Sequence, residues 1–102
     1  MTHGELVNEI LTYPKFQEHG RFWKQHVGIF ELPNGMKIKI GTKGMADICG
    51  IHNGRMVQIE CKVGADRQRP EQLSWQTMIE RFGGIYILAR SIEDVERGLS
   101  VS

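Results

Sequence analysis

The dipeptide Asn53-Gly54 constrains the fold of this 102-residue chain more than any other feature. It lies between two apolar runs, and Asn-Gly is the strongest short-range signal for a two-residue β-hairpin turn. We therefore expect residues 45–63 to form a hairpin that pairs directly about this turn. The same register places Asp47 opposite Glu60, unless a bulge shifts the pairing.

The predicted hairpin has one apolar face and one charged face, because side chains alternate along a strand. The apolar face carries Ile48, Val57, Ile59, Cys61 and Val63. Asp47, Glu60 and Lys62 share the other face, where cross-strand neighbours lie about 4.5–5.5 Å apart at Cβ. Two facing carboxylates repel each other, and a divalent cation would remove that repulsion. The alternative is a polar outer face neutralised by Lys62.

The first part of the chain predicts one helix and two extended runs. Thr2 and Glu5 form a capping box at the start of the helix, and Pro14 should break or kink it. Residues 21–32 are expected to be extended, residues 33–35 (Pro-Asn-Gly) to turn, and residues 36–41 to form a strand.

The last part of the chain predicts helix, strand, helix. Pro70 fits a first helical position, and Gly83-Gly84 a helix end. Residues 85–90 should form a short buried strand, and a final helix should run from Ser91 to about Gly98. The inward stripe of the middle helix is expected to be Gln72, Trp75, Gln76, Ile79 and Phe82. The order helix, two or three strands, helix, strand, helix predicts an α/β fold with a mixed sheet, in a single domain over residues 1–102.

Composition is that of an ordinary globular protein, with 40% hydrophobic and 25% charged residues. The longest apolar run is too short to span a bilayer and the N-terminus does not resemble a signal peptide, so a cytoplasmic location without a membrane is expected. The two cysteines do not indicate a disulfide framework. Cys49 and Cys61 fall on opposite faces of the hairpin, which argues against a shared zinc ion.

Positive charge is concentrated in two segments although the net charge is only +1. Such segments are typical of a groove that binds a polyanion, whereas the simpler alternative is a solvated face. The candidates for phosphate contact are Lys24, Lys37, Lys39, Lys43, Arg67 and Arg69.

Other residues give weaker signals. Gln72 lies in the first turn of a helix on its inward stripe, where an amide could orient water or contact a phosphate; the alternative is a satisfied polar residue at a helix end. Phe22 and Trp23 are expected in the core, with base stacking as the alternative. The histidines form no spaced motif.

These residues together resemble the VRR-NUC family of the PD-(D/E)xK nuclease superfamily. The resemblance runs through "GMADICG", "IECK", the basic loop, Gln72 and Trp75, and "GGIYILARSIEDV", which is similar to the family's last strand and helix. Asp47 matches the motif aspartate, Glu60 and Lys62 match E-x-K, and Gln72 matches a glutamine shared with archaeal Holliday junction resolvases. The resemblance covers residues from about 41 to 99, and more loosely the chain from Glu5. Cys61 departs from the usual apolar residue, often valine.

The resemblance implies a restriction-endonuclease-like α-β-β-β-α-β core and DNA phosphodiester hydrolysis that depends on Mg²⁺ or Mn²⁺. Catalytic residues would be Asp47, Glu60, Lys62 and Gln72. Metal ligands would be Asp47, Glu60 and the backbone carbonyl of Cys61. Glu5 is the candidate for an extra carboxylate, and its capping-box role is the alternative.

The implied substrate is branched DNA such as a Holliday junction, because a chain this short has no room for a sequence-reading domain. The resemblance also implies a bacterial or phage-encoded homodimer, whose interface could use Phe22, Trp23, Ile29 and Phe30. One alternative is a catalytically inactive nucleic-acid-binding or assembly module with a nuclease fold. The other is a nicking or end-processing nuclease on non-junction DNA.

Overall fold

The protein has three helices, one 3₁₀ turn and six strands within residues 1–26 and 28–100, which are the residues that the computed structural model describes. In chain order they are α1 (His3–Leu11), η1 (Pro14–Gln17), β1 (Gly20–Lys24), β2 (Gly28–Glu31), β3 (Lys37–Ile40), β4 (Ile48–His52), β5 (Arg55–Cys61), α2 (Pro70–Arg81), β6 (Ile85–Ala89) and α3 (Ile92–Ser100). The final helix therefore ends two residues beyond the expected Gly98.

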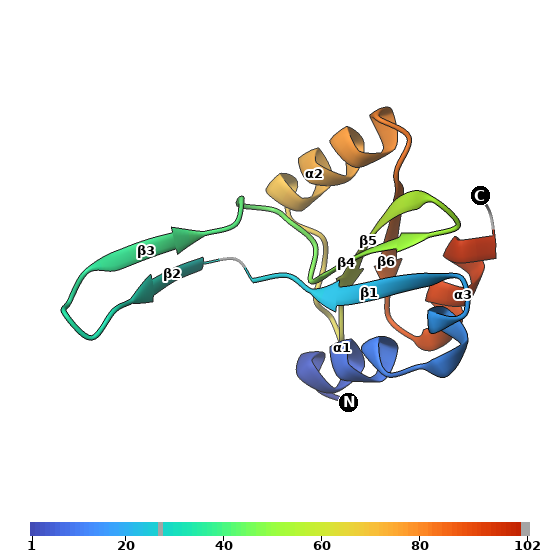
Figure 1. Cartoon of the computed structure of the whole chain (residues 1–102), viewed down its shortest axis with the longest axis horizontal. Helices are drawn as coiled ribbons and strands as arrows, with labels where there is room; N and C mark the ends of the chain where they lie inside the picture. The colour runs from blue at the N-terminus through green and yellow to red at the C-terminus, as the bar shows by residue number, and fades with distance from the viewer. Residues whose placement is uncertain (27, 101–102) are drawn as a thin grey trace.

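Four of the strands form one mixed sheet in the order β1-β4-β5-β6. The pairs β1–β4 and β4–β5 are antiparallel, whereas β5 and β6 run parallel and are joined by α2. Figure 1 shows α2 on one face of this sheet and α1 and α3 on the other. The predicted α/β class with a mixed sheet is confirmed.

The hairpin about Asn53-Gly54 has the predicted register. Both turn residues have positive φ angles, 49° and 78°, as a type I′ turn requires. Residue pairing runs without a bulge from the turn to Ile48 and Ile59, which face each other. This register fixes which residues of β5 share a face.

The main hydrophobic core lies between the sheet and the helices α1 and α3. Ile48, Val57, Ile59 and Cys61 are fully buried in it, as their alternation predicted. A smaller cluster on the other face places Ile79 of α2 against Tyr86 and Ala46. Val57, Ile59 and Cys61 of β5 therefore point into the main core, whereas Gln58 and Glu60 point toward α2.

Helix α1 begins at the predicted capping box. The Thr2 hydroxyl accepts the Glu5 N–H at 3.1 Å, and the Glu5 carboxylate accepts the Thr2 N–H at 2.8 Å. The helix ends at Leu11, before Pro14 starts the 3₁₀ turn. Since three apolar side chains of α1 are buried, its first turn is fixed relative to the sheet.

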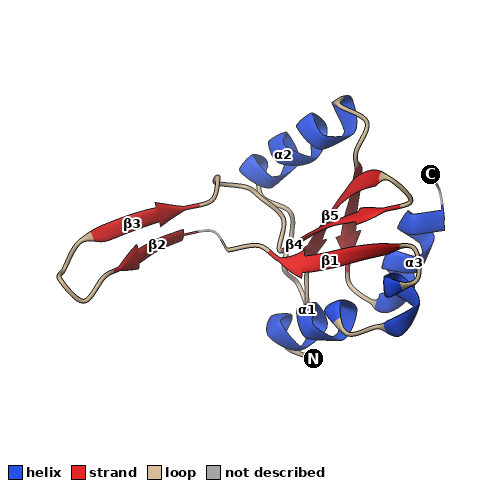
Figure 2. Ribbon diagram, viewed as in Figure 1, coloured by secondary structure: helices blue, strands red, loops and turns tan. Residues whose placement is uncertain are grey.

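Strands β2 and β3 form a separate antiparallel ribbon that projects from the sheet (Figure 2). The expectation of two or three strands before the middle helix was wrong, because residues 21–32 contribute to two different sheets. Val27, within that extended run, lies outside the described residues. The predicted turn at residues 33–35 connects the two ribbon strands.

Two aromatic residues lie where the sequence did not predict them. Phe82 was expected on the inward stripe of α2 but is 78% exposed, because the helix ends at Arg81 and the chain turns at Gly83. Trp23 was expected in the core but is 46% exposed, whereas Phe22 is buried as expected. Adjacent strand residues point to opposite faces, so only one of this pair reaches the core.

No helix within residues 1–26 and 28–100 combines the length and the apolar character needed to cross a membrane.

Candidate active site

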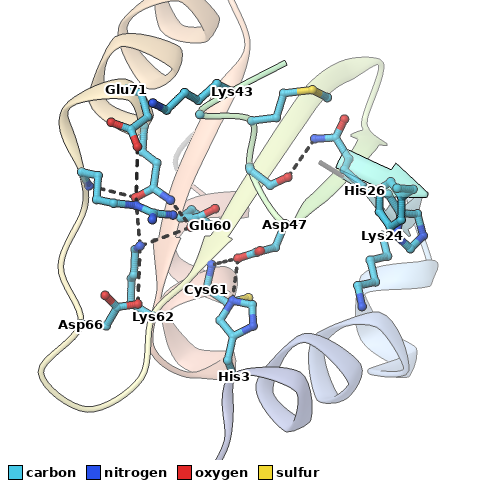
Figure 3. Close-up of a pocket in the computed structure, with 17 residues that line it drawn as sticks. His3, Lys24, His26, Lys43, Asp47, Glu60, Cys61, Lys62, Asp66 and Glu71 are labelled. Carbon is cyan, nitrogen blue, oxygen red and sulfur yellow. Dashed lines mark hydrogen bonds and ion pairs between the residues drawn. The ribbon is translucent and has the colours of Figure 1, made fainter. Parts of the chain in front are cut away.

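A pocket of about 500 Å³ lies at the edge of the sheet where β1 and β5 end and β4 begins. It is lined by the four predicted catalytic residues, Asp47, Glu60, Lys62 and Gln72, together with residues from the ribbon and from α1. Figure 3 shows Asp47, Glu60 and Lys62 around this space, and all three come from the hairpin segment. The structure therefore brings the four residues together.

Asp47 is held from both strands that flank it. Its backbone carbonyl accepts the N–H of Gln25 at 2.8 Å, just after β1 ends. Its Oδ2 atom accepts the N–H of Cys61 at 2.9 Å, so the carboxylate reaches the end of β5 directly. Asp47 thus lies at the expected end of the hairpin, but a side-chain contact takes the place of further backbone pairing there.

Glu60 is a buried carboxylate with one satisfied and one unsatisfied oxygen. The residue is only 3% exposed. Its Oε2 accepts the side-chain N–H of Gln72 at 2.8 Å and lies 3.4 Å from the ammonium of Lys62. Its Oε1 is buried and has no hydrogen-bond partner among the described residues. A buried oxygen of this kind calls for an explanation, because leaving a carboxylate unpaired is costly.

Lys62 and Gln72 complete a buried network around Glu60. The Lys62 ammonium donates to Gln72 Oε1 at 2.9 Å and lies 3.7 Å from Asp66 Oδ2. The same Gln72 oxygen accepts the backbone N–H of Arg69 at 2.9 Å, which caps the start of α2. Gln72 is therefore a satisfied polar residue at the helix end, and its side chain also lines the pocket.

The pKa of Glu60 is raised to about 7 in the folded protein, from an ordinary value near 4.5. Burial is the largest cause, and the negative charge of Asp47 adds to it, while Lys62 acts in the opposite direction. Burial also raises the pKa of the Cys61 thiol to about 12. The thiol is therefore neutral at pH 7 and points into the core, so Cys61 offers the pocket only its backbone.

A divalent cation fits this arrangement of donors. Two carboxylates lie close enough for one to raise the pKa of the other, and Glu60 Oε1 lacks a partner among the described residues. The described residues contain no group of three or more His, Cys, Asp or Glu side chains that could hold a metal ion. The ligands available to a cation there would be Asp47, Glu60 and a backbone carbonyl, and Mg²⁺ suits so small a set because water and phosphate can complete its shell.

A close contact at Gly44 brings the loop before Asp47 against the start of α2. Gly44 has φ of 93°, and an added Cβ would come within 2.3 Å of the Glu71 carbonyl oxygen. Only glycine fits such a close approach at positive φ. The contact explains why a glycine precedes Asp47 by three residues, and it sets the width of the pocket between the hairpin and α2.

The predicted basic residues fall into three groups, and all six are exposed. Three of them, Lys24, Lys43 and Arg69, line the pocket. Lys37 and Lys39 lie on β3 of the projecting ribbon. Arg67 lies in the loop before α2 and outside the set that lines the pocket.

Glu5 is engaged at the helix start and does not belong to the residues that line the pocket. The residue of α1 that reaches the site is His3, whose Nε2 lies 3.0 Å from Asp47 Oδ2. No sequence pattern indicated His3, because 44 residues separate it from its partner. Its proximity to the capping box is the one local signal that could have drawn attention to it.

Gln58 is a buried glutamine that was not predicted, and it hydrogen-bonds to residues next to the pocket. Its side-chain oxygen accepts hydrogen bonds from Gln25 at 2.9 Å and from the Trp75 indole at 3.1 Å. Its amide donates toward Cys49 Sγ at 3.0 Å. Gln58 lies two residues before Glu60 on the same face of β5, so strand alternation was the signal that placed it there.

The sequence matches no protein-family model and no curated protein.

Proposed function

We propose that this chain is a metal-dependent, structure-specific DNA endonuclease that hydrolyses phosphodiester bonds in branched DNA. The observation that carries the proposal is the convergence of Asp47, Glu60, Lys62 and Gln72 on one pocket. Two carboxylates beside a buried ammonium and an amide form a site that suits a cation and a phosphate.

The order of the elements supports a restriction-endonuclease-like core. Around the main sheet the chain runs α1, β1, β4, β5, α2, β6, and the ribbon is inserted between β1 and β4. This is the α-β-β-β-α-β order that the VRR-NUC resemblance implies. The acidic residues lie at the start of β4 and the end of β5, and the glutamine lies at the start of the helix that follows.

The cation would be Mg²⁺ or Mn²⁺, held by Asp47, Glu60 and the backbone carbonyl of Cys61. Such an ion polarises a bound phosphate and makes a bound water more nucleophilic at neutral pH. The buried Lys62 ammonium would stabilise negative charge that develops on the phosphate. Gln72 orients both Lys62 and Glu60, since its amide contacts the two side chains at 2.9 and 2.8 Å.

DNA would approach across the open side of the pocket. Lys24 and Lys43 border this side from the base of the ribbon, and Arg69 borders it from the start of α2. Cations from three segments around one acidic centre suit a phosphate backbone that passes over the site. Lys37 and Lys39 would extend the contact along the ribbon.

A homodimer belongs to the same proposal. Two active sites at a fixed spacing allow the paired cuts that resolve a four-way junction. Trp23, Ile29 and Phe30 are exposed near and on the ribbon and remain candidates for the interface. Phe22 is buried and is no longer a candidate. A two-stranded ribbon is marginally stable by itself, which favours its packing against a second copy.

Cleavage of labelled four-way junctions, flaps and plain duplex, each with Mg²⁺, Mn²⁺ or EDTA, tests the proposal. We expect cuts in the branched substrates with either metal and none with EDTA. Cleavage confined to duplex ends or single nicks would favour the nicking or end-processing enzyme. Tight DNA binding without cleavage in any metal would favour the inactive binding module.

A further inference from the structure

His3 is the one residue of α1 that lines the pocket, within the described part of the chain. Its Nε2 lies 3.0 Å from Asp47 Oδ2, and Figure 3 shows the imidazole directed at the carboxylate. An ionised carboxylate only accepts hydrogen bonds, so this contact is a hydrogen bond in the tautomer that carries its proton on Nε2. In that tautomer His3 donates to Asp47 from a segment 44 residues earlier in the chain.

The contact gives one oxygen of Asp47 a second hydrogen-bond partner. Oδ2 already accepts the Cys61 N–H at 2.9 Å, and His3 adds a second donor from a different element. Two donors on one oxygen fix the rotation of the carboxylate and hence the position of its other oxygen. Groups that orient a metal ligand in this way commonly change metal affinity or activity when removed.

The first turn of α1 is built to hold His3 in place. The capping box of Thr2 and Glu5 fixes where the helix begins, and Leu6 and Val7 anchor it in the core. The His3 side chain is itself 45% exposed, so it contributes little to packing. A structural role as a core residue therefore does not account for its position.

We propose that His3 is a positioning residue, whose imidazole N–H holds Asp47 in the orientation that binds the cation. This inference rests on the proposed function, because it concerns the cation site of the same pocket. The resemblance implied an extra metal-binding carboxylate at Glu5, whereas the role proposed for His3 is to donate a hydrogen bond to a metal ligand.

The test uses His3→Ala, His3→Gln and Glu5→Ala in the full chain. Glutamine keeps an N–H donor at a similar reach from the backbone, whereas alanine removes it. Glu5→Ala is the matched control, because it weakens the same helical turn without removing the donor to Asp47. Mn²⁺ affinity is measured without DNA by titration calorimetry or electron paramagnetic resonance, alongside the melting temperature of each variant.

We expect His3→Ala to weaken Mn²⁺ binding by about tenfold or more, the usual effect of losing such a partner. His3→Gln should restore most of the affinity. Glu5→Ala should lower the melting temperature and cost much less affinity than His3→Ala, because the donor to Asp47 is still present. In cleavage assays, His3→Ala should lower kcat with little change in KM for DNA.

Equal Mn²⁺ affinity in wild type and His3→Ala would overturn the inference, as would an equal loss in His3→Gln and His3→Ala. An equal loss in Glu5→Ala would reduce His3 to a helix-stabilising role. If the wild type binds Mn²⁺ but cuts no DNA, the proposed function fails and the affinities still decide the role of His3. If the wild type binds no Mn²⁺, both fail.

Discussion

Gln72 Nε2 donates to Glu60 Oε2 across 2.8 Å and joins the first turn of α2 to the end of β5. The other end of the same amide accepts from the Lys62 ammonium at 2.9 Å. A single side chain thus sets the relative positions of the buried carboxylate and the buried ammonium.

Removing either carboxylate should abolish cleavage without unfolding the protein. Asn at position 47 still offers an oxygen to the Cys61 N–H, and Gln at position 60 still offers one to Gln72. Since each change removes one of two repelling charges, the melting temperature in EDTA should be equal or higher. Asp47→Asn and Glu60→Gln are compared with wild type by cleavage and by thermal unfolding. Undiminished cleavage in either variant would end the nuclease assignment.

Lys62 and Gln72 should matter more for turnover than for DNA binding. Lys62→Ala is expected to lower the rate by roughly 10²–10³, the usual effect of losing one donor to developing charge. Gln72→Ala should slow the reaction through misplacement of Lys62 and Glu60. Gln76→Ala, one turn further along α2, is the control, because Gln76 does not line the pocket. Single-turnover rates and binding affinities should separate the two effects, and equal losses in both would mean that these residues only hold DNA.

Stability without metal should fall as the pH rises from about 5 to 7. The pKa of Glu60 is raised to about 7 in the folded protein, mainly by burial and then by the charge of Asp47. Over this range the folded state keeps a proton that the unfolded state has lost, so the free energy of unfolding decreases with pH. Glu60→Gln removes the titrating group and should flatten this part of the profile. Thermal unfolding of both proteins in EDTA between pH 4.5 and 8 is the measurement, and parallel profiles would refute the assignment to Glu60.

The effect of replacing a basic residue should depend on whether that residue lines the pocket or lies on the ribbon. Each phosphate contact removed should lower the slope of log affinity against log salt by about 0.9. Substitution of Lys24, Lys43 or Arg69 should also lower the cleavage rate, because these residues line the pocket. Substitution of Lys37 or Lys39 on the ribbon should weaken binding with little effect on turnover. Affinity measured at several salt concentrations checks this, and charge reversal at Arg67 with no change of slope would remove that loop from the DNA surface.

The protein should be a dimer at micromolar concentration. Sedimentation equilibrium is expected to give about twice 11.7 kDa, whereas a mass near 11.7 kDa would refute the dimer. Ile29→Asp should weaken association, because Ile29 is 70% exposed on the ribbon. Phe82→Asp is the matched control, since Phe82 is similarly exposed at the distant end of α2. A monomer that still cuts junctions should make uncoupled single cuts, which would favour the nicking enzyme.

The sequence by itself determined the local features of the fold. The turn at Asn53-Gly54, the capping box of Thr2 and Glu5, and the start of α2 at Pro70 all lie where expected. Each of these signals acts through a few neighbouring residues, by a positive φ angle, a side-chain hydrogen bond or a fixed proline ring. The hairpin register then placed Glu60 and Lys62 on one face without any knowledge of the rest of the fold.

Only the tertiary structure decided what covers that face and what reaches it. Alternation shows which residues share a side of a strand, but not whether a helix buries that side, so the 3% exposure of Glu60 was unforeseen. Likewise, His3 meets Asp47 because helix packing brings together two segments that are 44 residues apart. Strands β2 and β3 form a separate ribbon, although apolar and polar residues alternate in β3 as they do in a strand of a larger sheet. These contacts depend on non-local packing, whose energy is spread over many residues and leaves no short pattern in the sequence.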